Sequence, residues 1–213
     1  MSAAISLASI VGYGDIFQFL LKIKMSKWMV DEVYTRGIDP SLRTNPLLIP
    51  MVHRFHLLRM RISHVVNSLS TFVMTRVVHS LGLEFQEKLD AATDLDQVRQ
   101  LHDWYVGELK DRCLLRDRAA AVNTAILEIF NAAYDCRRCW DTICLGAEAV
   151  ALEAAVVDAE IEFRLLERRF KKAVRFLVTL LEGAVKKDIY PHLAGLYESI
   201  KGADTFDPIF PSI

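Results

Sequence analysis

Apolar residues recur at intervals of three and four along most of this chain, which is the spacing of one buried face of an α-helix. The clearest series comprises Leu58, Ile62, Val65, Leu69, Phe72 and Val73. No segment alternates apolar and polar residues for long enough to predict a sheet. The pattern therefore predicts an all-α fold, a bundle of about six to seven helices of which several are long and antiparallel.

Prolines and glycines divide the first half of this pattern. A first helix is expected from about Tyr13 to Tyr34, with a loop from Gly37 to Pro50, where three residues that precede prolines disfavour helix. A long helix then starts near Met51, bends around Gly82 and ends near Ala92. The core candidates of the first helix are Ile16, Leu20, Ile23 and Val30.

The next helix is expected to start at a cap, either Thr93 or Asp94, with Asp96 or Gln97 in the capping-box position. Its predicted core face is Val98, Leu101, Tyr105 and Leu109. A fifth helical segment buries Val122, Ile126, Ile129 or Phe130, and Ala133, and Gly146 marks a break after it.

A near-heptad apolar stripe predicts one more long helix in the last third of the chain. The stripe comprises Leu152, Val156, Ala159, Phe163, Leu166, Phe170, Val174, Leu177 and Leu181. Glu160 with Arg164, and Glu167 with Lys171, are i,i+4 pairs that support its exposed side. A last short helix is expected around His192 to Ile200.

The chain has 213 residues and a formal net charge of −1, which suits one well-buried domain. Its mean hydropathy of +0.21 is high for a small soluble monomer. A large helical core explains this value, as does an apolar surface that a partner covers. No segment is a convincing membrane span, and a sequence pI of about 6.6 argues against nucleic acid. We expect neither a membrane nor a nucleic acid as partner.

The residues for a metal site are present, namely Cys136, Cys139 and Cys144 together with His53 and His56. Structural zinc sites place their cysteines on tight turns, whereas Cys136 and Cys139 lie in an Ala-rich helical stretch. Buried, reduced thiols are therefore the favoured interpretation. No nucleophile elbow, phosphate loop or dinucleotide fingerprint is present. We expect no enzyme, no catalytic residue, no cofactor and no metal.

Basic residues gather in two regions although the net charge is near zero. Residues 51–81 carry Arg54, Arg59, Arg61 and Arg76 as their only formally charged groups. The late helix carries Arg164, Arg168, Arg169, Lys171, Lys172 and Arg175. On one interpretation these side chains are solvated or pair with acidic residues inside the bundle. On the other, a basic face meets an acidic protein, and charge steers the association.

Several short motifs lie on the helical scaffold in a fixed order. They are Leu58-Arg59-Met60, Met74-Thr75-Arg76, Gly82-Leu83-Glu84-Phe85, Asp94-Leu95-Asp96, His102 and Asp111-Arg112-Cys113-Leu114-Leu115-Arg116. This string resembles the C-terminal domain of the gamma-tubulin complex proteins, densely from about Tyr13 to Trp140 and more loosely to Leu181. The second and third motifs resemble the component 5 branch of that family.

The resemblance implies a structural role. In this family the C-terminal helical domain holds gamma-tubulin, the N-terminal domain packs laterally against neighbouring subunits, and the resulting ring nucleates microtubules. It implies gamma-tubulin and other complex components as partners. It also implies a place in the cytoplasm and cytoskeleton, at microtubule-organising centres such as the centrosome and spindle pole.

The resemblance also sets the expected domain organisation: an unmatched segment over residues 1–12, the helical domain over 13–203 and an irregular tail over 204–213. Family members are several times longer, and nothing in this chain resembles their N-terminal domain, so it is expected to be a subunit or a fragment. The alternative is a helical protein–protein adaptor that retains the fold without binding gamma-tubulin.

Residue roles follow from the same resemblance. The signature residues expected to be structural are Leu58, Arg59, Asp94, Leu95, Asp96, His102, Leu114 and Leu115. Of these, Arg59 and His102 are expected to hold helices together. The residues assigned to the core are Leu58, Leu69, Leu101, Leu114 and Phe170. Because tubulins are acidic, the expected partner contacts are Arg168, Arg169, Lys171 and Lys172.

Overall fold

The computed structural model describes residues 7–35, 46, 48–147, 152–187 and 190–203. These residues form helices joined by short turns and contain no strand, which confirms the all-α fold. The α-helices are α1 (Leu7–Thr35), α3 (Ile49–Thr71), α4 (Ser80–Asp90), α5 (Leu95–Arg112), α6 (Ala120–Ala147), α7 (Leu152–Lys186) and α8 (Ala194–Ile200). Short 3₁₀ turns follow α5, precede α8 and end the described chain, at Asp117–Ala119, Pro191–Leu193 and Lys201–Ala203.

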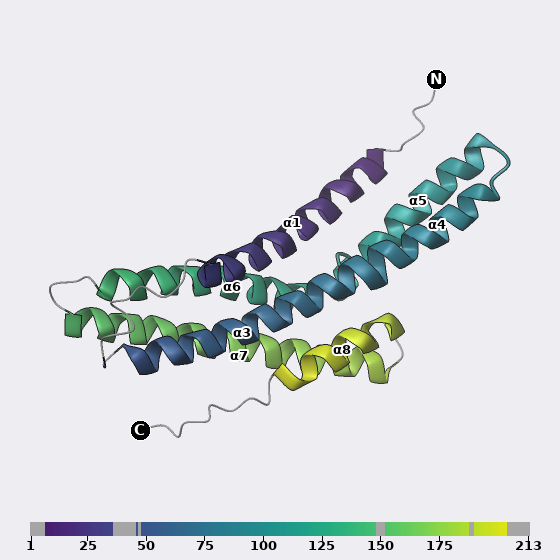
Figure 1. Cartoon of the computed structure of the whole chain (residues 1–213). Helices are drawn as coiled ribbons and strands as arrows, with labels where there is room; N and C mark the ends of the chain where they lie inside the picture. Colours follow the sequence, from purple (N-terminus) through teal and green to yellow (C-terminus); the bar gives the residue numbers. More distant parts are fainter. Residues whose placement is uncertain (1–6, 36–45, 47, 148–151, 188–189, 204–213) are drawn as a thin grey trace.

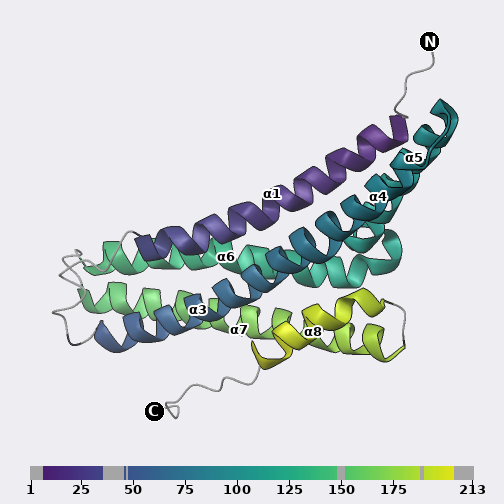
Figure 2. The same cartoon turned by 45° about the vertical axis from the view of Figure 1, so that its right-hand side comes forward.

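Four long helices, α1, α3, α6 and α7, lie alongside one another and form the body of the molecule (Figures 1 and 2). Helix α3 runs antiparallel to α1, and α7 runs antiparallel to α6. Helices α4 and α5 form a hairpin that projects beyond the body, and this hairpin is called the arm below. Helix α8 folds back against α7 and α3.

Helices α3 and α4 form one continuous rod. The π-helix Phe72–His79 (η1) joins them, so the departure from α geometry precedes the bend expected around Gly82. Backbone hydrogen bonds of a π-helix join residues five apart instead of four, and the Thr75 hydroxyl donates a hydrogen bond to the Thr71 carbonyl at 2.6 Å. If the rod is counted once, the described residues form five long helical segments and the short α8. The prediction was six to seven helices. The count of long segments is just below this range, and the count with α8 is at its lower limit.

Helix α1 begins at Leu7, whereas the sequence analysis expected a start near Tyr13. The residues before Tyr13 continue the helical spacing, because Ser9 and Gly12 are buried in line with Ile16 and Phe19. Helix α3 begins at Ile49 with Pro50 in its first turn, where a missing N–H is tolerated. Most of the predicted loop over residues 37–50, and all of the predicted tail over 204–213, lie outside the described residues.

The body is held together by an aromatic cluster between α3, α6 and α7. Phe55 stacks on Trp140 with ring centroids 5.0 Å apart, and Phe163 lies 6.4 Å from Phe55. All three rings are almost completely buried. Such aromatic pairs stabilise by about 0.5–1.5 kcal/mol beyond their burial, so this cluster anchors α7 to the rest of the body.

Most core assignments are correct. The four that are buried are Leu58, Leu69, Leu114 and Phe170. The assignment of Leu101 is wrong, because its side chain is only half-buried. It lines a hollow of about 340 Å³ in the arm beside Trp104 and Gln97. The side of α5 that carries Leu101 faces α4 across this hollow, whereas α1 contacts α5 through His102 and Asp103, so the predicted core face of α5 is only partly covered.

Candidate interaction surfaces

The four basic residues predicted to contact a partner all lie on α7 but do not share one face. Arg168 and Lys172 are four residues apart and therefore lie one above the other on the exposed side. Neither of them forms an ion pair with any residue that the structure describes. Two unpaired basic groups thus remain available on the outside of this helix.

The other two members of the predicted set are engaged within the chain. The Arg169 guanidinium lies 3.5 Å from the carboxylate of Asp135 on α6. The Lys171 ammonium lies 3.3 Å from the carboxylate of Glu167, one turn earlier on α7. Both pairs are at least partly solvent-exposed and stabilise by about 0.2–1 kcal/mol at most. The predicted cluster therefore divides into a free pair and a paired flank.

Exposed apolar residues continue the line of the free pair along α7. Together they make what we call the outer stripe of α7, which comprises Val157, Ile161, Leu165, Arg168, Lys172 and Phe176. At 100° per residue these six side chains fall within about a third of the helix circumference. The stripe is apolar in its first half and largely basic in its second, a composition that suits the contact with an acidic protein.

The first half of the outer stripe borders a hollow between the beginnings of α3 and α7. This hollow has a volume of about 340 Å³ and is lined by Pro50, Met51, Val157 and Ile161 among others. Glu160 stands beside it and accepts hydrogen bonds from Arg54 at 2.9 Å and from Arg164 at 2.7 Å. Burial opposes ionisation of this carboxyl, but the two guanidinium groups outweigh it and lower its pKa.

Two of the arginines in residues 51–81 also contact other residues of this chain. Arg54 bridges α3 to α7 through Glu160, and the Arg59 guanidinium lies 5.2 Å from the Tyr34 ring of α1. Arg59 is a signature residue, and its position joins α3 to α1 through a cation–π contact. The interpretation of pairing with acidic residues inside the bundle holds for Arg54, whereas Arg59 contacts an aromatic ring.

Signature residue His102 lies where α5 crosses the first half of α1. Its Nε2 atom and the Tyr13 hydroxyl are 3.1 Å apart in a hydrogen bond. One turn before Tyr13, the Ser9 hydroxyl donates to the Asp103 carboxylate at 2.5 Å. Further along, the Lys110 ammonium lies 2.7 Å from Asp15. Three polar contacts thus fix α1 to the arm, and His102 supplies the middle one.

The signature residues of the Asp94-Leu95-Asp96 motif serve the start of α5. Asp94 is the N-cap, and its carboxylate accepts a hydrogen bond from the Gln97 backbone N–H at 2.8 Å. The Gln97 side chain in turn accepts from the Thr93 backbone N–H at 3.0 Å, so a capping box forms one residue out of the usual register. Leu95 and Asp96 are exposed, and the Asp96 carboxylate lies in the first turn, where the helix dipole favours it.

Signature residues Leu114 and Leu115 end α5 in a Schellman motif. The Leu114 N–H donates to the Asp111 carbonyl and the Leu115 N–H to the Lys110 carbonyl, both at 2.9 Å. Leu114 has a positive φ of 61°, a left-handed conformation that usually selects glycine. Its buried side chain and a hydrogen bond from Asn123 to its carbonyl at 3.2 Å hold it there.

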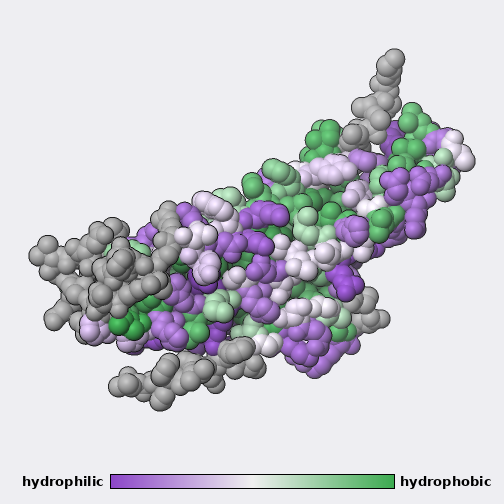
Figure 3. All heavy atoms as spheres, in the orientation of Figure 1, coloured by the Kyte–Doolittle hydropathy of each residue, from purple (hydrophilic) through white to green (hydrophobic). Residues whose placement is uncertain are grey.

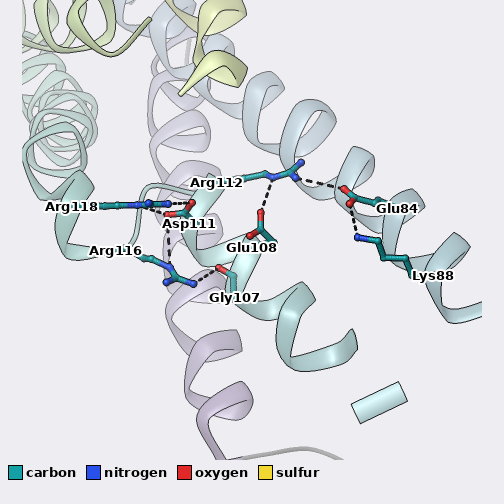
Figure 4. A network of polar contacts seen from close by, with 8 residues as sticks. All are labelled: Glu84, Lys88, Gly107, Glu108, Asp111, Arg112, Arg116 and Arg118. Atoms are coloured by element: carbon teal, nitrogen blue, oxygen red, sulfur yellow. Dashed lines mark hydrogen bonds and ion pairs between the residues drawn. The ribbon is translucent and has the colours of Figure 1, made fainter. Parts of the chain in front are cut away.

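A polar network surrounds this turn at the base of the arm (Figure 4). Asp111 accepts hydrogen bonds from Arg118 and lies 3.8 Å from Arg116, which also donates to the Gly107 carbonyl at 3.1 Å. Arg112 joins Glu108 and Glu84, linking α5 to α4. Most of the charged groups between 84 and 118 in this view are therefore bonded to one another, so they serve to fix the arm.

The cysteines and histidines considered for a metal do not assemble into a metal-binding group. Among the described residues no group of three or more His, Cys, Asp or Glu side chains could hold a metal ion. Cys113, Cys136 and Cys139 are buried free thiols. Burial raises the pKa of Cys113 and Cys139 to about 12. Within the described part of the chain, no helix is both long and apolar enough to span a membrane.

Helix α1 carries a surface that the sequence analysis did not single out. Its buried residues are Ser9, Gly12, Ile16, Phe19, Ile23, Ser26, Val30 and Val33. The opposite side is also apolar, and we call it the outer seam of α1, comprising Leu7, Ile10, Val11, Phe17, Leu21 and Trp28. Apolar groups are visible along the edge where α1 lies (Figure 3). The sequence does carry a signal for this surface, because apolar residues lie on both sides of the helix. Such a pattern is typical of a helix that packs against neighbours on both sides.

Long helices that expose an apolar seam and a mixed apolar and basic stripe define an all-α helical protein, and exposed surfaces of this composition are typical of contacts between proteins. A family model for the gamma tubulin complex component C-terminal region matches residues 1–200. The chain therefore belongs to the gamma-tubulin complex component C-terminal family. The match includes residues 1–12.

The chain is similar to three curated relatives in particular. It is 34% identical to gamma-tubulin complex component 5 of Mus musculus over 88% of this chain and 19% of that protein. It is 33% identical to component 5 of Macaca fascicularis over 88% of this chain and 27% of that protein. Its identity with the component 3 homolog of Xenopus laevis is 22%, over 73% of this chain and 17% of that protein. The chain thus spans only 19–27% of the component 5 relatives.

Proposed function

We propose that this chain is a structural subunit, or a fragment of one, of the gamma-tubulin ring complex, and that it binds gamma-tubulin and supports microtubule nucleation. The observation that carries this proposal is the family match over residues 1–200, together with 34% identity to component 5. The role is structural and not enzymatic. The chain acts in the cytoplasm, on the cytoskeleton, at centrosomes and spindle poles, where other complex components are its further partners.

The outer stripe of α7 is the surface proposed for gamma-tubulin. Tubulins are acidic, and Arg168 and Lys172 are exposed basic groups without an ion pair in the described chain. Beside them, Ile161, Leu165 and Phe176 expose apolar area that a partner would cover. In such an interface the apolar residues contribute affinity, while the charges speed the encounter and set its orientation.

The test is capture of purified gamma-tubulin by the purified 213-residue chain at several salt concentrations. The proposal predicts capture that weakens as salt rises, because the Debye length falls from about 10 Å at 0.1 M to about 3 Å at 1 M. Reversing the charge of Arg168, Arg169, Lys171 and Lys172 together should reduce capture while the circular dichroism spectrum stays helical. Capture that is the same with and without these four charges at low salt would remove the basic residues from the interface.

The alternative function, a helical adaptor without gamma-tubulin binding, makes a different prediction in the same experiment. A chain with a helical spectrum and a cooperative melt that captures no gamma-tubulin at any salt concentration supports the adaptor. The same chain should then still capture another complex component. This outcome would leave the fold and the family unchanged and would place the gamma-tubulin contacts elsewhere in the longer relatives.

A further inference from the structure

The outer seam of α1 is a second surface, and it differs from the outer stripe of α7 in composition. Leu7 is 77% exposed, Phe17 is 65% exposed and Trp28 is 53% exposed. At 1.5 Å per residue, the seam runs for about 32 Å along the helix. A single exposed apolar side chain is ordinary on a protein surface, but a predominantly apolar line of this length, interrupted at Gly14 and Lys24, marks an interaction site.

The spacing of the seam fits a partner helix. Leu7, Leu21 and Trp28 recur in steps of seven or fourteen residues, and Ile10 and Phe17 are offset from them by three. This is the a and d pattern with which one helix packs against another, with Gly14 at one a position and Lys24 at one d position. The buried face of α1 has the same seven-residue repeat, displaced by two residues and therefore turned by about 200°. The helix is thus built to pack against neighbours on two opposite sides, and the described chain supplies only one of them.

Charge indicates the chemistry of the missing neighbour. Lys22 and Lys24 are exposed on either side of the second half of the seam, and Lys27 lies further along the helix, nearer its buried face. None of the three forms an ion pair within the described residues. The acidic residue Asp15 is already paired with Lys110, and Glu32 is paired with Arg137. The seam therefore presents unneutralised positive charge beside apolar side chains.

A second copy of this chain is a poor match for that chemistry. A second copy would bring another set of lysines to the seam. On α1, the one acidic residue without an ion pair in the described chain is the half-buried Asp31. Like charges beside a helix–helix seam oppose pairing, whereas opposite charges favour it and set the partner. A helix with apolar residues in heptad spacing and acidic residues beside them satisfies both features of the seam.

We propose that the outer seam of α1 docks an acidic amphipathic helix of a partner protein, lengthwise, with its carboxylates facing Lys22 and Lys24. This site lies on a different helix from the outer stripe proposed for gamma-tubulin and has its own occupant. It does not depend on gamma-tubulin binding. The chain then has two docking surfaces, one mixed and basic on α7 and one predominantly apolar on α1.

The test uses a labelled synthetic peptide of about four heptads with leucine at the a and d positions and glutamate at the flanking positions, against a twin with lysine at those positions. Fluorescence anisotropy with the full 213-residue chain should give at least about tenfold tighter binding of the acidic peptide. Phe17→Glu with Leu21→Glu should weaken that binding by about tenfold or more. The matched control, Val157→Glu with Ile161→Glu on α7, should leave it unchanged.

A charge exchange separates docking from folding. Lys22→Glu with Lys24→Glu changes only exposed side chains and should reverse the preference, so that the basic peptide binds more tightly than the acidic one. Sedimentation of the unmodified chain tests the second copy as occupant. A dimer that Phe17→Glu with Leu21→Glu dissociates would overturn the proposal in favour of self-association. Absence of peptide binding, or equal loss in the α7 control, would also overturn it.

Discussion

Helices α1 and α7 bury their inner faces in similar ways and differ on their outer faces. Both place a near-heptad series of residues against α6. On its outer side, α7 exposes apolar residues in its first half and mainly arginine and lysine in its second, whereas α1 exposes a mainly apolar line. The comparison teaches that the inner faces determine the fold, while the outer faces carry the two surfaces proposed above for partners. Substitutions on the two faces should therefore have effects of different size and kind.

The largest effect is expected on the inner face of α7. Phe163 is 1% exposed and packs against Phe55 and the Arg54 guanidinium. Phe163→Ala should lower the free energy of unfolding by about 3–5 kcal/mol, because it leaves a cavity between three helices. Phe176→Ala, on the outer side of the same helix, should change it by no more than about 0.5 kcal/mol. Urea melts of the two variants check this, and equal losses would contradict the division into inner and outer faces.

The next effect tests the inner face of α1, where small residues allow α5 to approach closely. A Cβ atom on Gly12 would lie 2.5 Å from the Val106 side chain, so Gly12→Ala should destabilise by about 1–3 kcal/mol through overpacking. Gly14 faces open space, and Gly14→Ala should stabilise by about 0.5–1 kcal/mol because alanine favours helix. Thermal melts should therefore move in opposite directions, and a shift of the same sign in both would refute the close approach.

A smaller effect concerns pH and the ion pairs that join α7 to α3. The pKa of Glu160 is lowered from its usual 4.5 by Arg164 and Arg54, which outweigh the opposing effect of burial. A lowered folded-state pKa means that the unfolded chain binds this proton first. The stabilisation is therefore present above about pH 4.5 and is lost as the pH falls from there through the lower folded value. Glu160→Gln should flatten this part of the stability profile, and superimposable profiles would contradict it.

The smallest effect on stability is expected on the outer seam of α1. Leu21→Lys replaces an exposed side chain and should change the free energy of unfolding by no more than about 0.5 kcal/mol. It should nevertheless reduce binding of a hydrophobic dye, because the seam would lose one of its apolar residues. Dye fluorescence beside a urea melt measures both quantities. A large loss of stability would mean that Leu21 belongs to the core.

The sequence predicted the inner faces well because burial leaves a periodic trace. The α7 stripe from Ala159 to Leu181 is buried as the spacing predicted, and Asp94 is one of the two caps considered. For α1 the predicted core residues Ile16, Ile23 and Val30 are buried, whereas Leu20 is half-buried. The spacing thus identified the inner side of α1, but it did not show that the apolar residues on the opposite side are exposed.

The arm marks the other limit of sequence reasoning. Leu101 has the spacing of a core residue, yet its burial depends on how many helices cover α5 at that level, and spacing carries no such information. The left-handed turn at Leu114 was also hidden, because the residue that usually signals it is glycine. Likewise, the four basic residues of α7 form one cluster in the sequence. The spacing already predicted the pair of Glu167 with Lys171, but only the position of Asp135 on α6 separates Arg169 from Arg168 and Lys172.

That separation offers the most direct test of the proposed function. We would measure gamma-tubulin capture for Arg168→Glu with Lys172→Glu and, as a matched control of equal charge change, for Arg169→Glu with Lys171→Glu. Reversing the two unpaired charges, Arg168 and Lys172, should weaken capture by about tenfold or more at low salt. Reversing the two paired charges, Arg169 and Lys171, should weaken it clearly less. Equal weakening by both variants, or full capture by the first, would contradict a gamma-tubulin site on the outer stripe of α7.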